Sequence, residues 1–373
     1  MINNNSVAFI AKIKSITQIP NADNIELITV NGWTSICQKG IHKEGDLVLC
    51  VTTDAVIPTN LAVKWGVINY LRKGNRVRTI KLKGVYSECI LITTASNGFI
   101  YSQEGDDLMY QLDIYKYEPL PIIIKDNQGR KYKYHQNPNF HVYHKFPNHK
   151  NVPDMFDKTD MVQVSRKIHG TNARYGIVKK SKLSIVDKIK RFFGNAWIEY
   201  EYVYGSHNVE KGSDSQGFYS TDIWKTVAIE NSIESKLWEY VKNSDKNFIK
   251  EGIIIYGEIY GPGIQGSNYH YNKISPTFAI FDVKLNNEYV NTDMVYHTCN
   301  ELNILHVPIL QFCEYDYNLF YELFVVNNFI ENTKIPHEGI VIKSITGDRA
   351  KIAKVINPDY LIYSEKHHVP DSH

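Results

Sequence analysis

The sequence Ser165-Arg166-Lys167-Ile168-His169-Gly170-Thr171-Asn172 follows an alternating apolar run at residues 161–164. Alternation of this kind predicts a strand with one buried face, and Gly170 predicts a turn at its end. In an extended strand, Lys167 and His169 point to the same side. A lone lysine and histidine in this arrangement would usually belong to a surface hairpin. Because four polar or special residues directly surround one lysine, we interpret the segment as a functional site.

Two carboxylates stand at the ends of predicted strands farther along the chain. The apolar runs at residues 253–256 and 339–342 predict buried strands, and Glu258 and Glu338 lie beside them. A third, aromatic strand is predicted at residues 278–283. Three lysines follow the second glutamate closely: Lys343, Lys351 and Lys354. A single glutamate at a strand end is usually solvated, so only the order and spacing of these segments together indicate a function.

That order and spacing resemble the motif series of covalent nucleotidyltransferases, which include polynucleotide ligases and mRNA capping enzymes. The form lysine-x-histidine-glycine-threonine-asparagine resembles the ATP-dependent RNA ligases, because DNA ligases and capping enzymes usually carry aspartate where His169 stands. The resemblance covers residue 161 to about residue 360. The sequence upstream resembles the N-terminal domain of the Naegleria-type RNA ligases. Nineteen residues follow Lys354, and we expect no trailing OB domain there.

The resemblance implies the chemistry of the site. Lys167 would attack the α-phosphate of ATP and form lysyl-AMP, which divides a difficult phosphoryl transfer into easier steps. AMP would then pass to an RNA 5′-phosphate, and an RNA 3′-hydroxyl would displace it. Glu258 and Glu338 would orient a hydrated Mg²⁺ or Mn²⁺ and hold the ribose or the nucleophile, since Mg²⁺ takes one or two carboxylates and keeps several waters. Phe281 would stack on adenine.

The resemblance also implies a set of phosphate-binding residues. Lys343, Lys351 and Lys354 would grip the α-phosphate and stabilise the charge that develops there. Around Gly170, His169 and Asn172 would contact phosphate or the leaving group. One feature departs from the family pattern, which usually has a Lys-x-Lys pair near the last motif. Lys351 is out of phase with Lys354 on a strand, so Lys354 is the stronger candidate.

Two further departures concern the geometry of the site. A segment after the nucleophile usually carries an arginine that touches AMP or RNA, whereas this chain has Gly205-Ser206-His207-Asn208. Ser206 or His207 would take the place of that arginine. Strict alternation also puts Glu338 and Lys343 on opposite faces of a strand. A bulge, or a position of Glu338 at the start of the strand, would reconcile them.

The N-terminal part predicts a small β-barrel. Strand-like runs occur at residues 7–18, 25–30, 47–51, 76–82 and 89–94, and Asn31-Gly32 marks a tight turn. The phrase Pro20-Asn21-Ala22-Asp23 followed by Ile25-Glu26 resembles the start of OB-fold modules.

We therefore expect an α+β chain. An OB-like β-barrel at residues 1–115 and a connector at 116–155 would precede a nucleotidyltransferase domain at 156–373, with ATP-grasp-like antiparallel sheets and helices. Helical spacing of apolar residues predicts helices at 231–243 and 316–328.

Three polar clusters allow two interpretations each. The basic cluster at residues 72–83 could bind single-stranded RNA along an OB face, or it could be a solvated strand pair. The basic cluster at residues 179–191 could be an inserted helix that touches RNA, or a solvated loop. His141, His144 and His149 match no metal motif, so we expect surface histidines rather than a metal site.

Composition restricts the setting of the protein. The formal net charge of +2 neither requires nor excludes a nucleic acid partner. Five scattered cysteines without metal-ligand spacing favour reduced thiols in the cytoplasm, of a cell or of a virus host. The start lacks the features of a signal peptide, and no apolar run approaches a membrane span. We expect a monomer with no membrane partner.

The leading hypothesis is an ATP-dependent RNA ligase that joins RNA ends carrying a 5′-phosphate and a 3′-hydroxyl. Two alternatives stay open at this point. One is a capping-type guanylyltransferase, which would form its covalent adduct from GTP. The other is a non-catalytic RNA-binding protein built on an OB module.

Overall fold

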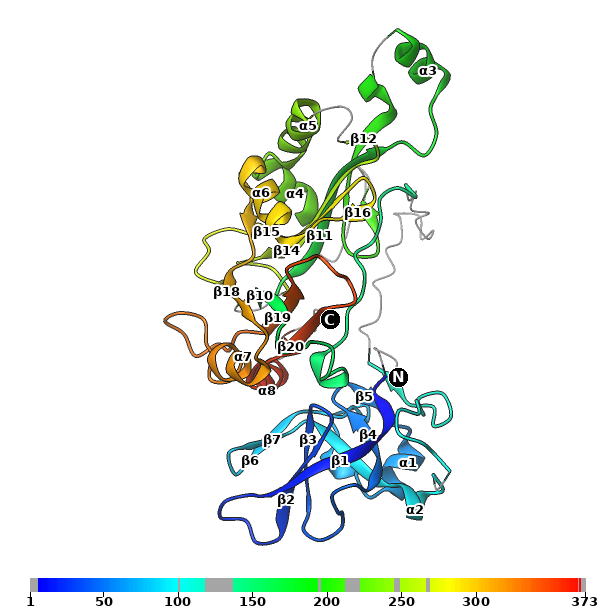
Figure 1. The fold of residues 1–373 in the computed structure, drawn as a ribbon, viewed down its shortest axis with the longest axis vertical. Helices are drawn as coiled ribbons and strands as arrows, with labels where there is room; N and C mark the ends of the chain where they lie inside the picture. Colours follow the sequence, from blue (N-terminus) through cyan, green and yellow to red (C-terminus); the bar gives the residue numbers. More distant parts are fainter. Residues whose placement is uncertain are drawn as a thin grey trace.

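The computed structural model describes residues 6–99, 101–117, 137–193, 196–211, 222–244, 249–265, 269–367 and 369. Figure 1 shows a β-rich N-terminal domain at one end and a larger domain of sheets and helices above it. The C-terminal helix returns to the junction between the two domains.

The N-terminal domain is built on a five-stranded antiparallel sheet in the order β3-β2-β1-β4-β8. Its strands are β1 Ala8–Gln18, β2 Ile25–Val30, β3 Trp33–Gln38, β4 Leu47–Thr52 and β8 Cys89–Thr93. These confirm four of the five predicted runs, whereas the run at residues 76–82 forms only β6 Ile80–Leu82, paired with β7 Val85–Ser87. The smaller elements are β5 Ala55–Val56, β9 Tyr115–Lys116, α1 Thr59–Lys64, η1 Ile68–Tyr70 and α2 Thr94–Asn97.

The larger domain contains two antiparallel sheets. The first has the order β18-β10-β19-β20 and consists of β18 Ile309–Glu314, β10 Met161–Lys167, β19 Gly339–Ser344 and β20 Ile352–Ile356. The second follows the order β13-β12-β11-β14-β15-β16, with β17 Leu305–His306 parallel to β15. Its other strands are β13 Glu210–Lys211, β12 Tyr200–Gly205, β11 Thr171–Lys179, β14 Gly252–Tyr260, β15 Thr277–Leu285 and β16 Glu288–Tyr289. The strands β10 and β11 are consecutive, so the short segment at residues 168–170 joins the two sheets.

Helices cover one face of the second sheet and leave the other face for the site. The covering helices are α4 Ile223–Glu230, α5 Ile233–Asn243 and α6 Thr292–Leu302. Alternate residues Ala173, Tyr175 and Ile177 of β11 are buried in the same apolar cluster as these helices. Because side chains alternate along a strand, Asn172 and Arg174 lie on the opposite face.

The helix at 231–243 is confirmed by α5, and the helix at 316–328 by the shorter α7 Tyr317–Phe324. The remaining helical elements are α3 Ile185–Phe192, α8 Pro358–Lys366, η2 His149–Asn151 and η3 Ala196–Glu199. Within the described ranges, no helix has both the length and the apolar character needed to cross a bilayer.

The first basic cluster contacts the other domain. Arg78 lies 3.4 Å from a carboxylate oxygen of Glu365, and Lys81 lies 3.5 Å from Asp359, both in α8. The Tyr86 hydroxyl also donates to Asp359, at 2.8 Å. Several of these cations therefore connect the two domains, which neither interpretation from the sequence included.

A buried ion pair lies at the centre of this junction. Lys150, from η2, donates to Glu88, next to β8, and both side chains are almost fully buried. The neighbouring Trp33 Nε1 donates to Asn151 Oδ1 at 2.8 Å. A Cβ on Gly32 would lie 2.6 Å from the Lys150 Cα, so glycine in this turn is required by the approach of the second domain.

Removing one partner of this pair should destabilise the protein strongly. Glu88→Leu leaves the Lys150 ammonium buried without its carboxylate, and such a loss costs about 3–5 kcal/mol. The double variant Glu88→Leu, Lys150→Met should recover most of this stability, because an apolar pair restores a neutral junction. Urea unfolding of the full chain measures the free energy of unfolding of the single and the double variant. As a control, Glu251→Leu in the more exposed pair with Lys179 should change stability little. Equal destabilisation by the single and double variants would contradict the argument.

The connector histidines are not all on the surface. His149 is buried, its Nε2 bonds to the Tyr315 hydroxyl, and its ring stacks on Tyr317 at 4.3 Å. Burial lowers the pKa of His149 to about 4, and burial likewise lowers the pKa of His144 to about 4. The prediction of surface histidines is therefore wrong for His149, which packs in the aromatic core beside the domain junction.

Candidate active site

Lys167 and Glu338 form the centre of the candidate site. Lys167 is the last residue of β10 and lies opposite Gly339, the first residue of β19. Its Nζ donates to Glu338 Oε1. The Glu338 side chain is fully buried and that of Lys167 is 18% exposed. The lysine is thus held in a fixed position while its amine stays within reach of a ligand.

Gly339 explains how Glu338 reaches this position. Gly339 has φ +152°, and a Cβ there would lie 2.1 Å from the Val355 carbonyl oxygen. No other residue type fits without a shift of the neighbouring strand β20. Glu338 lies just before β19. Strict alternation along the strand therefore does not apply to it, and Glu338 and Lys343 need no bulge to share a face.

Three lysines project from one face of the first sheet. Ile340 and Ile342 are buried in the apolar cluster on the other face. The register pairs Lys167 with Gly339, Val341 with Lys354, and Gln163 with Lys343. Directly opposed residues share a face, so Lys167, Lys343 and Lys354 lie on one side of β10, β19 and β20. This face is suited to binding an anion.

The N-terminal domain contributes to this face. Burial, and then the positive charges of Lys167 and Lys116, lower the pKa of Lys354 to about 7. Lys116 belongs to β9, and a cavity of about 70 Å³ between the domains is lined by Lys116, Lys354 and Asp54. The β20 backbone is fixed here, since Lys354 N–H donates to the Pro147 carbonyl at 3.0 Å. Sequence reasoning missed Lys116 because nothing in its local sequence indicates this contact.

The second sheet supplies Glu258 and Asn172. These two residues lie directly opposite each other on β14 and β11, on the face away from the helices. Burial raises the pKa of Glu258 to about 8, with Lys167 opposing the shift and Glu338 adding to it. Gly170 allows the close approach of the strands, since a Cβ there would lie 2.3 Å from the Ile259 carbonyl oxygen.

The oxygen atoms at this point fit a hard divalent cation. Glu258 and Glu338 supply carboxylates, and Asn172 Oδ1 is buried without a hydrogen-bond partner in the described part of the chain. No cluster of three or more His, Cys, Asp or Glu side chains occurs among the residues described. Mg²⁺ or Mn²⁺ bound here would therefore keep several waters or take phosphate oxygens.

His169 lies in an aromatic cluster beside Lys167. It is buried, its Nδ1 lies 3.0 Å from the Tyr360 hydroxyl, and its backbone N–H donates to the Tyr271 hydroxyl at 2.8 Å. The Tyr269 ring packs at 4.7 Å. His169 thus connects the turn after Lys167 to α8, and its ring supports the position of that turn.

Lys343 is part of a buried polar network on Asp282. Lys343 lies 3.1 Å from Asp282, Arg349 donates to both carboxylate oxygens, and the Tyr143 hydroxyl donates at 2.8 Å. Burial opposes ionisation of Asp282, but Lys343 and Arg349 outweigh it and lower the pKa of this carboxyl group. Phe281 directly precedes Asp282, and the centroids of the Phe281 and Tyr143 rings lie 5.0 Å apart in an edge-to-face arrangement. Arg349, Tyr143 and Asp282 were missed in the sequence, although the position of Asp282 next to Phe281 was a usable signal.

Arg174 contacts the segment in which an arginine was expected. Arg174 is fully buried on β11, and its Nε donates to the Ser206 carbonyl at 3.0 Å. A second nitrogen donates to the Phe140 carbonyl. Burial, followed by the charges of Arg174 and Lys145, lowers the pKa of the nearby His207. Ser206 and His207 thus lie at the end of β12, where a buried guanidinium holds their backbone.

Lys351 lies apart from the other site lysines. Its Nζ is 2.6 Å from Asp160 and 3.5 Å from Asp157. Ser344 N–H donates to the Lys351 carbonyl, which places Lys351 at the opposite end of β19 from Lys167. Five residue positions separate these ends, or about 16 Å along the strand. The structure therefore does not bring Lys351 to the site.

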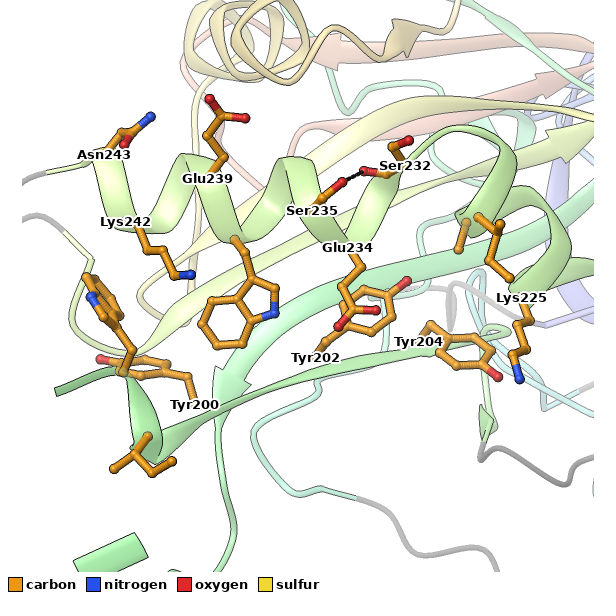
Figure 2. A pocket seen from close by; sticks show the side chains of 15 residues that line it. Tyr200, Tyr202, Tyr204, Lys225, Ser232, Glu234, Ser235, Glu239, Lys242 and Asn243 are labelled. Atoms are coloured by element: carbon orange, nitrogen blue, oxygen red, sulfur yellow. Dashed lines mark hydrogen bonds between the residues drawn. The ribbon is translucent and has the colours of Figure 1, made fainter. Parts of the chain in front are cut away.

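A groove of about 1250 Å³ lies on the other face of the second sheet. Figure 2 shows Tyr200, Tyr202 and Tyr204 of β12 in a row beneath α5. Tyr204 pairs with Tyr175, so this row shares the face that the helices cover. The groove is therefore separate from the face that carries Asn172 and Glu258.

Comparison with known proteins supports this arrangement. An RNA ligase family model matches residues 160–356, more than half of the chain, and an OB-fold domain model matches residues 7–94. No curated protein sequence matches. Among solved structures, the chain is similar to a Naegleria gruberi RNA ligase variant with AMP and Mn (21% identity, TM-score 0.72, covering 98% of this chain and 99% of that one). It is also similar to the Naegleria gruberi RNA ligase with pyrophosphate (21%, 0.71, 97% and 99%) and to a variant with ATP and Mn (21%, 0.70, 98% and 100%). These matches confirm the expected fold, an OB domain followed by a nucleotidyltransferase domain.

Proposed function

The chain belongs to the RNA ligase family, and from that premise we propose that it seals RNA 5′-phosphate and 3′-hydroxyl ends with ATP, through lysyl-AMP at Lys167. One observation carries this proposal. The Lys167 amine projects from a sheet face shared with Lys343 and Lys354 and contacts the buried carboxylate of Glu338. A proposed nucleophile that contacts a buried acid thus shares one sheet face with two further lysines.

ATP and a divalent metal ion are the proposed cofactors. The solved Naegleria relatives with ATP or AMP and Mn support this choice. Mg²⁺ or Mn²⁺ held by Glu258 and Glu338 would supply positive charge beside the phosphates. The partly buried Phe281 is the proposed platform for adenine. It lies near β19, because the next residue, Asp282, contacts Lys343 of that strand.

The proposed reaction has three steps. The Lys167 amine releases a proton to solvent and attacks the α-phosphorus of ATP, a phosphorus–nitrogen bond forms, and pyrophosphate leaves. An RNA 5′-phosphate oxygen then attacks the same phosphorus and breaks that bond, and Lys167 regains its proton. The RNA 3′-hydroxyl finally attacks the 5′-phosphate and expels AMP. Lys343 and Lys354 stabilise the negative charge that develops in these steps.

Sealing assays test this function. We expect 5′-phosphorylated RNA to be joined to an RNA 3′-hydroxyl with ATP and Mg²⁺ or Mn²⁺, and not with GTP. Nicked and single-stranded RNA, each with an all-DNA counterpart, define the substrate. Joining of all-DNA nicks alone would overturn the RNA assignment, and covalent labelling from GTP alone would favour the capping-type alternative.

Removing Lys116 should change the pH dependence of nucleotide binding. Lys354 is charged below its pKa of about 7 and neutral above it, so its attraction for phosphate is lost as the pH rises through 7. Lys116→Met removes a charge that lowers this pKa. The pKa of Lys354 should then rise, and the loss of AMP affinity should move to higher pH. Calorimetric titration with AMP in metal-free buffer measures the shift.

Two controls isolate the effect of Lys354. Glu258, with a pKa of about 8, also gains negative charge in this range, so the titration is repeated in the Glu258→Gln background. Lys12→Met, at an exposed lysine of β1, should leave the pH profile unchanged. A profile of Lys116→Met identical to that of the wild type would refute the role of the N-terminal domain.

The other expectations remain proposals. We propose domain boundaries at 1–115, 116–155 and 156–373, with the pairing of β9 and β5 extending the N-terminal domain to Lys116. We also propose a monomer that acts in the cytoplasm. Family membership favours ligation over both the capping-type enzyme and the non-catalytic RNA-binding protein.

A further inference from the structure

The helix α3 presents an apolar face that is exposed in the part of the chain that the structure describes. Ile185, Val186, Ile189 and Phe192 are 52–87% exposed, and Phe193 directly after the helix is 80% exposed. Figure 1 shows α3 at the end of the molecule farthest from the N-terminal domain. Exposed apolar groups gathered on one helix mark an interaction surface.

The pattern of this helix is amphipathic. At about 100° per residue, the four apolar helix residues cover an arc of about 120°. Lys188 and Lys190, both exposed, lie about 40° beyond the two ends of this arc. Their ammonium groups can therefore stay at a polar boundary while the apolar arc is buried.

Local contacts hold the helix in place. Asp187 N–H donates to Ser184 Oγ at 3.0 Å, and Ser184 N–H donates to Asp187 Oδ2 at 3.1 Å. This reciprocal arrangement is a capping box at the N-terminus of the helix. Lys180 lies 3.3 Å from Asp187 and ties the helix to the segment after β11. The helix is thus formed without using its apolar face.

We propose that α3 is a membrane-surface helix that attaches this protein reversibly to anionic bilayers. Residues 180–191 contain five basic residues and one acidic residue, so the segment complements a negatively charged surface. An RNA backbone would use these cations but would leave the aliphatic side chains Ile185, Val186 and Ile189 in water. A bilayer interface accommodates the cations and the aliphatic side chains together. The apolar face inserts at the boundary of the acyl chains, and the lysines contact the lipid headgroups. This replaces the expectation of no membrane partner, which considered only membrane-spanning runs.

Vesicle flotation of the full chain tests the proposal. We expect binding to phosphatidylcholine vesicles that contain phosphatidylserine, and much weaker binding to phosphatidylcholine alone. Ile189→Asp and Phe192→Asp should each lower binding at least about tenfold, because each removes buried apolar area from the bound state. Lys188→Gln with Lys190→Gln should weaken binding to the anionic vesicles and reduce its salt dependence.

Matched controls make the outcome decisive. Val63, an exposed apolar residue of α1, resembles Ile189 in exposure, and Val63→Asp should bind vesicles like the wild type. Thermal unfolding and covalent AMP labelling should be unchanged in the α3 variants, since α3 contributes to neither the core nor the candidate site. Absence of wild-type binding to anionic vesicles, or equal loss in Val63→Asp, would overturn the proposal. So would loss of RNA binding in Phe192→Asp when no vesicles are bound, which would assign the helix to RNA.

Discussion

Lys167→Ala should abolish covalent labelling of the protein by ATP that carries a radioactive α-phosphate. Truncation of the side chain to a methyl group leaves no amine at the end of β10, where Lys167 contacts Glu338. We expect a loss of at least about 10³-fold in both labelling and RNA sealing. Denaturing electrophoresis after incubation with labelled ATP measures the adduct, which should be labile to acid because its bond joins phosphorus to nitrogen.

Lys351→Ala is the matched control for this experiment. Lys351 is also a lysine at the end of a strand, but it pairs with Asp160 and Asp157 at the far end of β19. This variant should be labelled like the wild type. Normal labelling of Lys167→Ala would show that the nucleophile is elsewhere, and loss of labelling in Lys351→Ala would return that lysine to the site.

The core of the site was predictable from the sequence because its motif series resembles that of the RNA ligases, and because strands fix the direction of the side chains in those motifs. Lys167 ends β10, Glu338 directly precedes β19, and Glu258 and Lys354 lie within β14 and β20. Pairing of these strands with their neighbours brings residues together that are far apart in the chain. Lys351 shows the limit of the same logic. Its closeness to Lys354 in sequence suggested a shared role, but a residue before the strand has no fixed side, and two aspartates bind it instead.

Contacts between distant segments were beyond reach of the sequence. The position of Lys116 beside Lys354 depends on how the domains dock, and the buried pair of Lys150 and Glu88 lies at the same junction. The contacts of the first basic cluster were missed for the same reason, since its partner carboxylates lie in α8. Neither the charge pattern nor the periodicity of a sequence predicts which side chain across a domain junction a given residue will contact.

Replacing Glu338 should also have a large effect on covalent labelling. Its charged contact with Lys167 can be removed by a side chain of nearly the same shape. Its carboxylate is fully buried, and the residue after it is Gly339, whose backbone angle φ of +152° favours glycine. Glutamine keeps the size and one acceptor oxygen but removes the negative charge. Lys167 then loses its ion pair, and the proposed metal site loses one of its two carboxylates.

Glu338→Gln should therefore lower the rate of covalent AMP labelling on the order of 10²-fold, the usual cost of losing one electrostatic group from such a site. Single-turnover labelling with ATP at several Mn²⁺ concentrations measures the rate, and the variant should require more metal ion for half-maximal labelling. Glu251→Gln removes the carboxylate of another lysine–glutamate pair, at Lys179, and should label normally. Wild-type rate and metal dependence in Glu338→Gln would exclude this carboxylate from the first step. A rate loss without any change in metal dependence would assign Glu338 to holding Lys167 alone, because only the ion pair would then account for the effect.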